Sequence, residues 1–162
     1  MINSKIKYID IYSEDSQGLV ESYGERKIQF QRLPQRYQKS LRKDVWEVSE
    51  NSAGVSISFK TNSSELSVKW TVKLDFSMNH MTDVGVKGID LYYKENGRWG
   101  YLSSGIPSGK SNKAFLFKGF SEESREYRLH LPLYDSVTSL QIGIDEASSF
   151  EIVKDKDFPI VF

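Results

Sequence analysis

The sequence contains no cysteine and only two histidines. Without cysteine, the chain has no disulfide, no thiol nucleophile and no thiolate ligand for a metal. The histidines, His80 and His130, are a thin supply for catalysis or metal binding, because such sites need several suitable side chains that converge from different segments. We therefore assign no catalytic residue, no metal ligand and no cofactor to this chain.

A charge excess and long apolar runs are missing as well. The chain has 22 basic and 22 acidic residues, so its composition does not indicate a nucleic-acid partner. No apolar stretch reaches the ~18 residues of a membrane-spanning helix, and residues 1–7 lack the apolar run of a signal peptide. A mature secreted domain expressed from a new methionine would read the same way, so the localisation stays open. The 162 residues are most simply one domain.

Short alternating segments separated by polar turns make up most of the chain. We expect strands at residues 5–12, 27–31, 45–48, 55–60, 65–74, 86–94, 98–102, 113–118, 126–131 and 138–144, and at most a single helical turn, within 35–43. Turns at 51–54 and 96–97 should each join two strands in a hairpin. Many short, regularly spaced strands predict an all-β fold, an antiparallel two-sheet β-sandwich of jelly-roll-like type.

The period of two also predicts which side chains form the core. Val55, Ile57 and Phe59 share one face of their strand. On the next strand the shared apolar face comprises Leu66, Val68, Trp70, Val72 and Leu74. Trp70 is therefore assigned to packing. Trp99 and Tyr101 follow the Asn96–Gly97 turn and are better candidates for exposed aromatic side chains, although packing explains them equally well.

Residues 88–93, Gly-Ile-Asp-Leu-Tyr-Tyr, combine a carboxylate with aliphatic and aromatic neighbours on one expected strand. Ile89, Leu91 and Tyr93 should point to one face of this strand, and Asp90 and Tyr92 to the other. Aspartate is depleted in strands and costly to bury without a partner. Asp90 should therefore have a hydrogen-bond donor nearby, inside the domain or outside it.

Gly88-x-Asp90-Leu91-Tyr92 resembles the GxDLY signature of a domain found in front of SGNH-type (GDSL) hydrolase domains. The resemblance extends over roughly residues 25 to 150, and the order and spacing of several motifs carry it. These further motifs lie at residues 33–37, 51–54, 59–63, 79–82, 125–134 and 140–143. The resemblance implies an N-terminal domain, residues 1–157, followed at 158–162 by the first strand of a truncated SGNH hydrolase domain.

The serine-hydrolase apparatus itself is not in the sequence. No Gly-x-Ser-x-Gly occurs, and neither does the Gly-Asp-Ser-Leu-type block or the Asp-x-x-His pair of SGNH enzymes. By the resemblance, the parent enzyme would hydrolyse an ester, with an acyl group on a carbohydrate as the expected substrate. The 162-residue chain is itself expected to lack that activity.

Seven residues are candidates for contact with a neighbouring domain or a ligand. The resemblance points to Arg36, Tyr37, His80, Asp90 and Tyr92. Trp99 and Tyr101 are candidates because they are aromatic and follow the Asn96–Gly97 turn. Each has a structural alternative. Arg36 could pair with a carboxylate such as Asp90, and the aromatic side chains could pack in the domain. For His130 we expect only a structural or surface role.

These residues support three functional hypotheses. The first is an accessory domain that shapes or positions the substrate cleft of a C-terminal SGNH hydrolase domain in the same protein. The second is an independent, lectin-like carbohydrate-binding module, for which three tryptophans and nine tyrosines could provide stacking surfaces. The third is an enzyme in its own right, with its acid, base and nucleophile around His80. An isolated accessory domain would expose the surface meant for its partner and could form a homodimer through it.

Overall fold

The computed structural model describes residues 5–12 and 30–154 of the chain. The strands are β1 (Ile6–Ile11), β2 (Ser56–Thr61), β3 (Glu65–Val72), β4 (Ile89–Glu95), β5 (Arg98–Gly105), β6 (Ser111–Lys118), β7 (Arg125–His130), β8 (Val137–Asp145) and β9 (Phe150–Val153). The helices are the 3-10 turn η2 (Gln35–Tyr37), α1 (Lys43–Ser49) and α2 (Asp83–Lys87). Neither α-helix is long and apolar enough to cross a membrane, and this holds for the whole described part of the chain.

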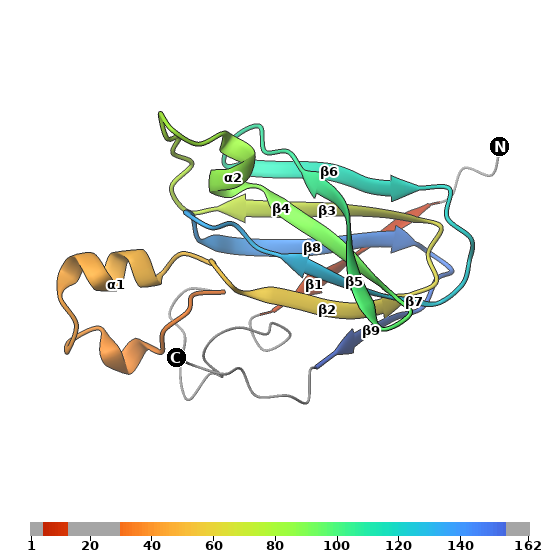
Figure 1. The fold of residues 1–162 in the computed structure, drawn as a ribbon, viewed down its shortest axis with the longest axis horizontal. Coiled ribbons are helices and arrows are strands. Elements are labelled where there is room, and N and C mark those ends of the chain that lie inside the picture. The colour runs from red at the N-terminus through yellow and green to blue at the C-terminus, as the bar shows by residue number, and fades with distance from the viewer. Residues whose placement is uncertain (1–4, 13–29, 155–162) are drawn as a thin grey trace.

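The described strands form two antiparallel sheets that pack face to face (Figure 1). One sheet has the order β1-β8-β3-β6, and the other has the order β5-β4-β7-β2-β9. β1 pairs with β8, β2 with β7, β3 with β6, and β4 with β5. These nested pairs are those of one long hairpin folded over on itself. The predicted antiparallel two-sheet β-sandwich is therefore confirmed.

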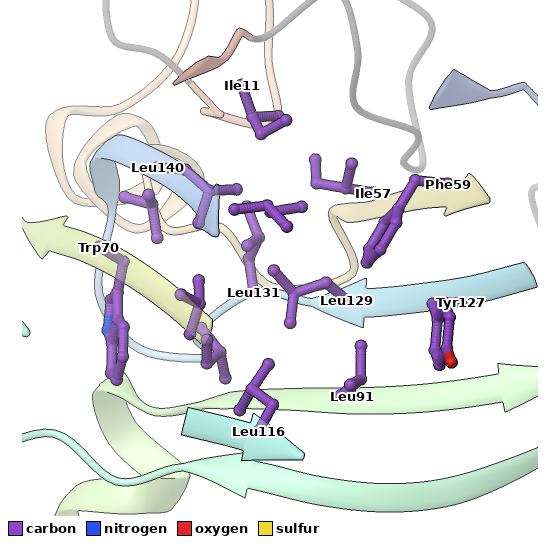
Figure 2. Packing of buried hydrophobic residues seen from close by; sticks show 14 of the residues in the cluster. Ile11, Ile57, Phe59, Trp70, Leu91, Leu116, Tyr127, Leu129, Leu131 and Leu140 are labelled. Atoms are coloured by element: carbon purple, nitrogen blue, oxygen red, sulfur yellow. The ribbon is translucent and has the colours of Figure 1, made fainter. Parts of the chain in front are cut away.

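The core lies between the sheets and follows the predicted alternation (Figure 2). Ile57 and Phe59 of β2 are buried, as are Val55, which directly precedes this strand, and Trp70 of β3. The remaining fully buried large side chains include Ile11, Leu66, Ile89, Leu91, Tyr127, Leu129, Leu140 and Ile142. Leu74 lies beyond the end of β3 and is exposed, so the predicted apolar face of this strand ends at Val72.

The expected strand at 45–48 is wrong, because these residues belong to α1. Trp46 and Ser49 are buried, whereas Val45 and Val48 are exposed, which is the one-sided burial of a short helix. Four apolar-alternating residues do not distinguish a strand from a helical turn. The acid Asp44 in the first turn is the signal that favours the helix. The turn at 51–54 therefore joins α1 to β2 and forms no hairpin.

Other elements also differ from the expectation. The central strand begins at Ile89 and not at residue 86, because Val86 and Lys87 belong to α2. Strand β9 was not predicted; it adds to the edge of the second sheet by pairing with β2. The expected strand at 27–31 falls mostly outside the described residues, and so does the segment 158–162.

The hairpin at Asn96–Gly97 is confirmed. Both residues have positive φ, 49° and 77°, as a primed hairpin turn requires. The turn joins β4 to β5, and the pairing shifts register between Leu91 and Tyr92. This hairpin places Trp99 and Tyr101 beside β4.

Leu129→Ala should destabilise the domain by about 2–5 kcal/mol, because it removes a fully buried side chain from between the sheets. Leu133→Ala is the matched control; its side chain is half exposed, and we expect a change within about 0.5 kcal/mol. Urea unfolding followed by tryptophan fluorescence measures both values. Equal effects of the two substitutions would contradict the core described above.

Candidate functional site

The signature residues 88–92 divide into two that serve the fold and two that face outward. Gly88 follows α2, and its N–H donates to the Val84 carbonyl at 3.1 Å. A Cβ at this position would lie 2.4 Å from that carbonyl oxygen, so a larger residue does not fit. Leu91 is fully buried in the core. Asp90 is exposed and Tyr92 is half-buried.

The carboxylate of Asp90 has its partner on the neighbouring strand. Ser104 of β5, which lies opposite Asp90 in the ladder, donates its hydroxyl to the carboxylate. The hydroxyl of Tyr101 lies 2.9 Å from the same Ser104 oxygen. Asp90 therefore sits at the surface within a small polar network, and the expected cost of burying it does not arise.

Tyr92 connects this network to the next strand of the sheet. Its ring packs edge-on against Tyr101, with 5.7 Å between centroids, and against His130 of β7, with 5.3 Å. We call Asp90, Tyr92, Tyr101, Ser104 and His130 the signature face. All five project from the outer side of the five-stranded sheet, away from the core.

His130, for which we expected only a structural or surface role, also belongs to this surface. Burial and the nearby Arg128 guanidinium lower the pKa of His130, and Asp90 opposes part of this effect. Both burial and Arg128 therefore favour the neutral imidazole. The pairing of β4 with β7 places His130 directly opposite Asp90, and the sequence carries no signal of this register.

Trp99 lies further along the same outer surface and is covered by cations. The Arg128 guanidinium stands 4.4 Å from the centre of the indole ring, and the Lys94 amine stands 5.3 Å from it. Arg128 also donates to Ser58 at 2.9 Å, and Lys94 pairs with Glu126 at 3.2 Å. The ring of Trp99 is thus less available for stacking than that of Tyr101, which is 57% exposed.

The other three candidates lie outside the signature face. The Arg36 guanidinium stacks over Tyr37 at 4.8 Å in η2. His80 is exposed in the loop before α2, with Nδ1 3.0 Å from the Asn79 side-chain oxygen. Within the described part of the chain, no salt bridge joins Arg36 to Asp90, the carboxylate named as its example partner.

The signature face does not have the arrangement of a catalytic triad. In a triad the imidazole stands between the serine hydroxyl and the carboxylate. In this domain the Ser104 hydroxyl donates directly to Asp90, and His130 meets the edge of Tyr92. Residues 5–12 and 30–154 also contain no group of three or more side chains that could hold a metal ion.

Sequence reasoning missed a buried polar network where α1, α2 and the β7–β8 loop meet. Lys87 is buried, and its amine lies 2.6 Å from Asp75 and 3.2 Å from Asp83. The hydrogen bond to Asp75 is the main cause of the raised pKa of Lys87, burial opposes it, and Asp83 adds to it. The i,i+4 spacing of Asp83 and Lys87 is the one signal of this network in the sequence.

A buried acid, Asp135, contacts the neighbouring loops. Asp135 is fully buried, and its carboxylate accepts hydrogen bonds from the backbone N–H groups of Leu74, Asp75 and Ser136 at 2.8–3.0 Å. A carboxylate that accepts several backbone N–H groups satisfies donors that would otherwise be buried without partners. Together with the Lys87 network, it joins the segment after β3 to α2 and to the β7–β8 loop.

Comparisons with known proteins place the domain. A family model described as GxDLY, the N-terminus of SGNH-hydrolase-type esterases, matches residues 6–150. A GDSL-like lipase from Bacteroides ovatus has a TM-score of 0.82 and 32% identity, over 91% of this chain and 43% of the lipase. A salicylyl-acyltransferase from a tetracycline biosynthetic pathway has a TM-score of 0.61 and 12% identity, over 94% of this chain and 42% of the acyltransferase. At this identity the similarity is one of fold alone. No curated protein matches in sequence. The chain spans less than half of either structure.

His130→Gln should reduce the loss of stability on acidification. Because the folded pKa lies below the ordinary value of about 6.5, the unfolded chain binds the proton first, and stability falls as the pH drops below that value. The urea midpoint, measured at about pH 7.5 and about pH 5.5, should therefore fall less in the variant. His80→Gln, in an exposed loop, is the control and should keep the original difference. An unchanged difference in His130→Gln would contradict the assignment.

Proposed function

Because the chain belongs to the GxDLY family, the N-terminal domain of SGNH-hydrolase-type esterases, we propose that it is an accessory domain that shapes or positions the substrate cleft of a C-terminal hydrolase domain. On this proposal residues 1–157 form the accessory domain, and residues 158–162 begin the hydrolase domain. Ester hydrolysis belongs to the partner, and this chain is non-catalytic.

The observation that carries the proposal is the outward position of Asp90 and Tyr92. Gly88 and Leu91 of the signature have clear roles inside the domain, where they allow the close approach of α2 and fill the core. Asp90 and Tyr92 fill no space between the sheets. Polar and aromatic residues that a fold does not need for packing are available for contact with another domain or with substrate.

The chemistry of the signature face supports an acylated carbohydrate as the substrate class. Tyr101 offers a largely exposed ring, and Tyr92 stands beside it. Asp90 and Ser104 add a carboxylate and a hydroxyl next to these rings. A flat aromatic surface beside hydrogen-bonding groups suits a sugar, which has both apolar C–H faces and hydroxyl groups.

The isolated 162-residue chain should not hydrolyse a chromogenic acetyl ester or acetylated oligosaccharides. The physical reason is that its serine, histidine and aspartate side chains on the signature face are not arranged for nucleophilic attack. Release of chromophore and of acetate measures this directly. Turnover that is lost in His80→Ala would contradict the proposal and make this sandwich an enzyme.

In the full-length esterase, Tyr101→Ala should lower kcat/KM for an acetylated oligosaccharide by about tenfold, the effect of truncating a contact aromatic. The effect on a small acetyl ester, which does not reach this surface, should be smaller. Phe115→Ala is the matched control. The side chain of Phe115 is 60% exposed, a fraction similar to the 57% of Tyr101, but it lies on β6 of the other sheet. Equal effects of both substitutions on both substrates would contradict a role at the cleft.

The exposed ring of Tyr101 also favours a second candidate function, an independent carbohydrate-binding module. This alternative differs from the first in what the isolated domain does alone. It requires glycan binding without the hydrolase domain, and a glycan screen on the isolated chain distinguishes the two. Binding that Tyr101→Ala abolishes would favour the module; absence of binding would favour the accessory domain.

A further inference from the structure

Exposed apolar side chains gather at one end of the sandwich. Val48 of α1, Leu74 after β3, Val84 of α2, Ile106 after β5, and Leu133 and Tyr134 of the β7–β8 loop are all exposed. We call these six residues the apolar end. Single exposed apolar residues are ordinary, but several at one end of a domain indicate an interaction surface.

Backbone contacts show that these segments share one end. The N–H of Tyr134 donates to the carbonyl of Val86 in α2 at 3.0 Å. Ser136, in the same loop, donates its hydroxyl to the carbonyl of Glu50 at the end of α1, at 2.6 Å. Gly105, just before Ile106, pairs with Ile89, just after α2. Figure 1 shows α1 and α2 at this common end of the two sheets.

Buried polar contacts tie together several segments of the apolar end. The buried Asp135 carboxylate fixes the backbone of Leu74 and Asp75, and the Lys87–Asp75 pair fixes α2 to the same loop. Charges nearby are paired with one another, as in Lys73–Glu50 at 2.5 Å. A preorganised surface loses little conformational entropy on docking. Its apolar residues would otherwise stay in water at a cost.

The course of the chain and a solved relative indicate which partner would cover the apolar end. Val153, the last residue of β9, pairs with Ser58, close to the start of β2 and therefore to α1. The last described strand thus runs toward the end of the sandwich where β2 begins and α1 lies. In the GDSL-like lipase, more than half of the polypeptide lies outside the part that this domain matches. We infer that the apolar end is the docking surface for the C-terminal SGNH hydrolase domain, an inference that rests on the proposed function.

This docking mode explains the position of the signature face. Asp90 is the second residue of β4, Ser104 is the next-to-last of β5, and His130 is the last of β7. All three lie at the strand ends next to α2. A hydrolase domain seated on the apolar end therefore has the signature face along its edge, where Asp90 and Tyr101 border a cleft between the two domains.

The test uses the full-length esterase with Leu133→Asp and, separately, Val48→Asp. Each places a charge in the docked surface, so proteolytic cleavage between the domains should accelerate by about tenfold or more. On heating, the two domains should unfold in two separate transitions and not in a single cooperative one. Phe115→Asp on β6 is the matched control and should change neither. The same substitutions in the isolated 162-residue chain should leave its thermal midpoint nearly unchanged, which excludes simple misfolding.

The outcomes are distinguishable. If Leu133→Asp and Val48→Asp behave like Phe115→Asp while Tyr101→Ala still lowers kcat/KM for the oligosaccharide, the docking surface is wrong and the proposed function stands. If none of these variants has an effect, both fail. If the two aspartate variants only abolish dimerisation of the isolated chain and leave the full-length protein unchanged, the occupant is a second copy, and the inference is overturned.

Discussion

Burial of one face of each sheet against the other is the interaction on which the rest of this domain depends. Because side chains alternate along a strand, every residue buried between the sheets fixes the outward direction of its neighbours. Leu91 and Leu129 point inward and are fully buried, so Asp90 and His130 must point outward, and the pairing of β4 with β7 brings them together. A shift of one residue in the register of either strand would turn the core side chains outward and disrupt the signature face as well.

The same constraint explains how much could be predicted from the sequence. The period of two predicted the sandwich, the β3 core face and the shared outward side of Asp90 and Tyr92. It could not predict Ser104 and His130 as their neighbours, because those contacts depend on the register between strands distant in sequence. It failed at 45–48, where a short apolar segment fits a helical turn as well as a strand, and at Lys87 and Asp135, whose partners come together only in the folded chain.

Two surfaces with different chemistry result from this fold, and they meet at one edge. The signature face is polar and aromatic, whereas the apolar end is carried on α1, α2 and neighbouring loops, which contacts of the buried Lys87 and the buried Asp135 tie together. The signature joins the two in one short segment. Gly88 closes α2 at the apolar end, Leu91 anchors β4 in the core, and Asp90 and Tyr92 form the outer surface between them. A domain that docks by one surface and borders a cleft with the other accounts for both.

The most direct test is to compare kcat/KM of the proposed full-length esterase with that of its hydrolase domain alone, on an acetylated oligosaccharide and on a small acetyl ester. An accessory domain that shapes the cleft predicts a large loss on the oligosaccharide when the sandwich is removed, and a much smaller loss on the small ester. Unchanged kcat/KM on both substrates, with the hydrolase domain still folded, would contradict the account.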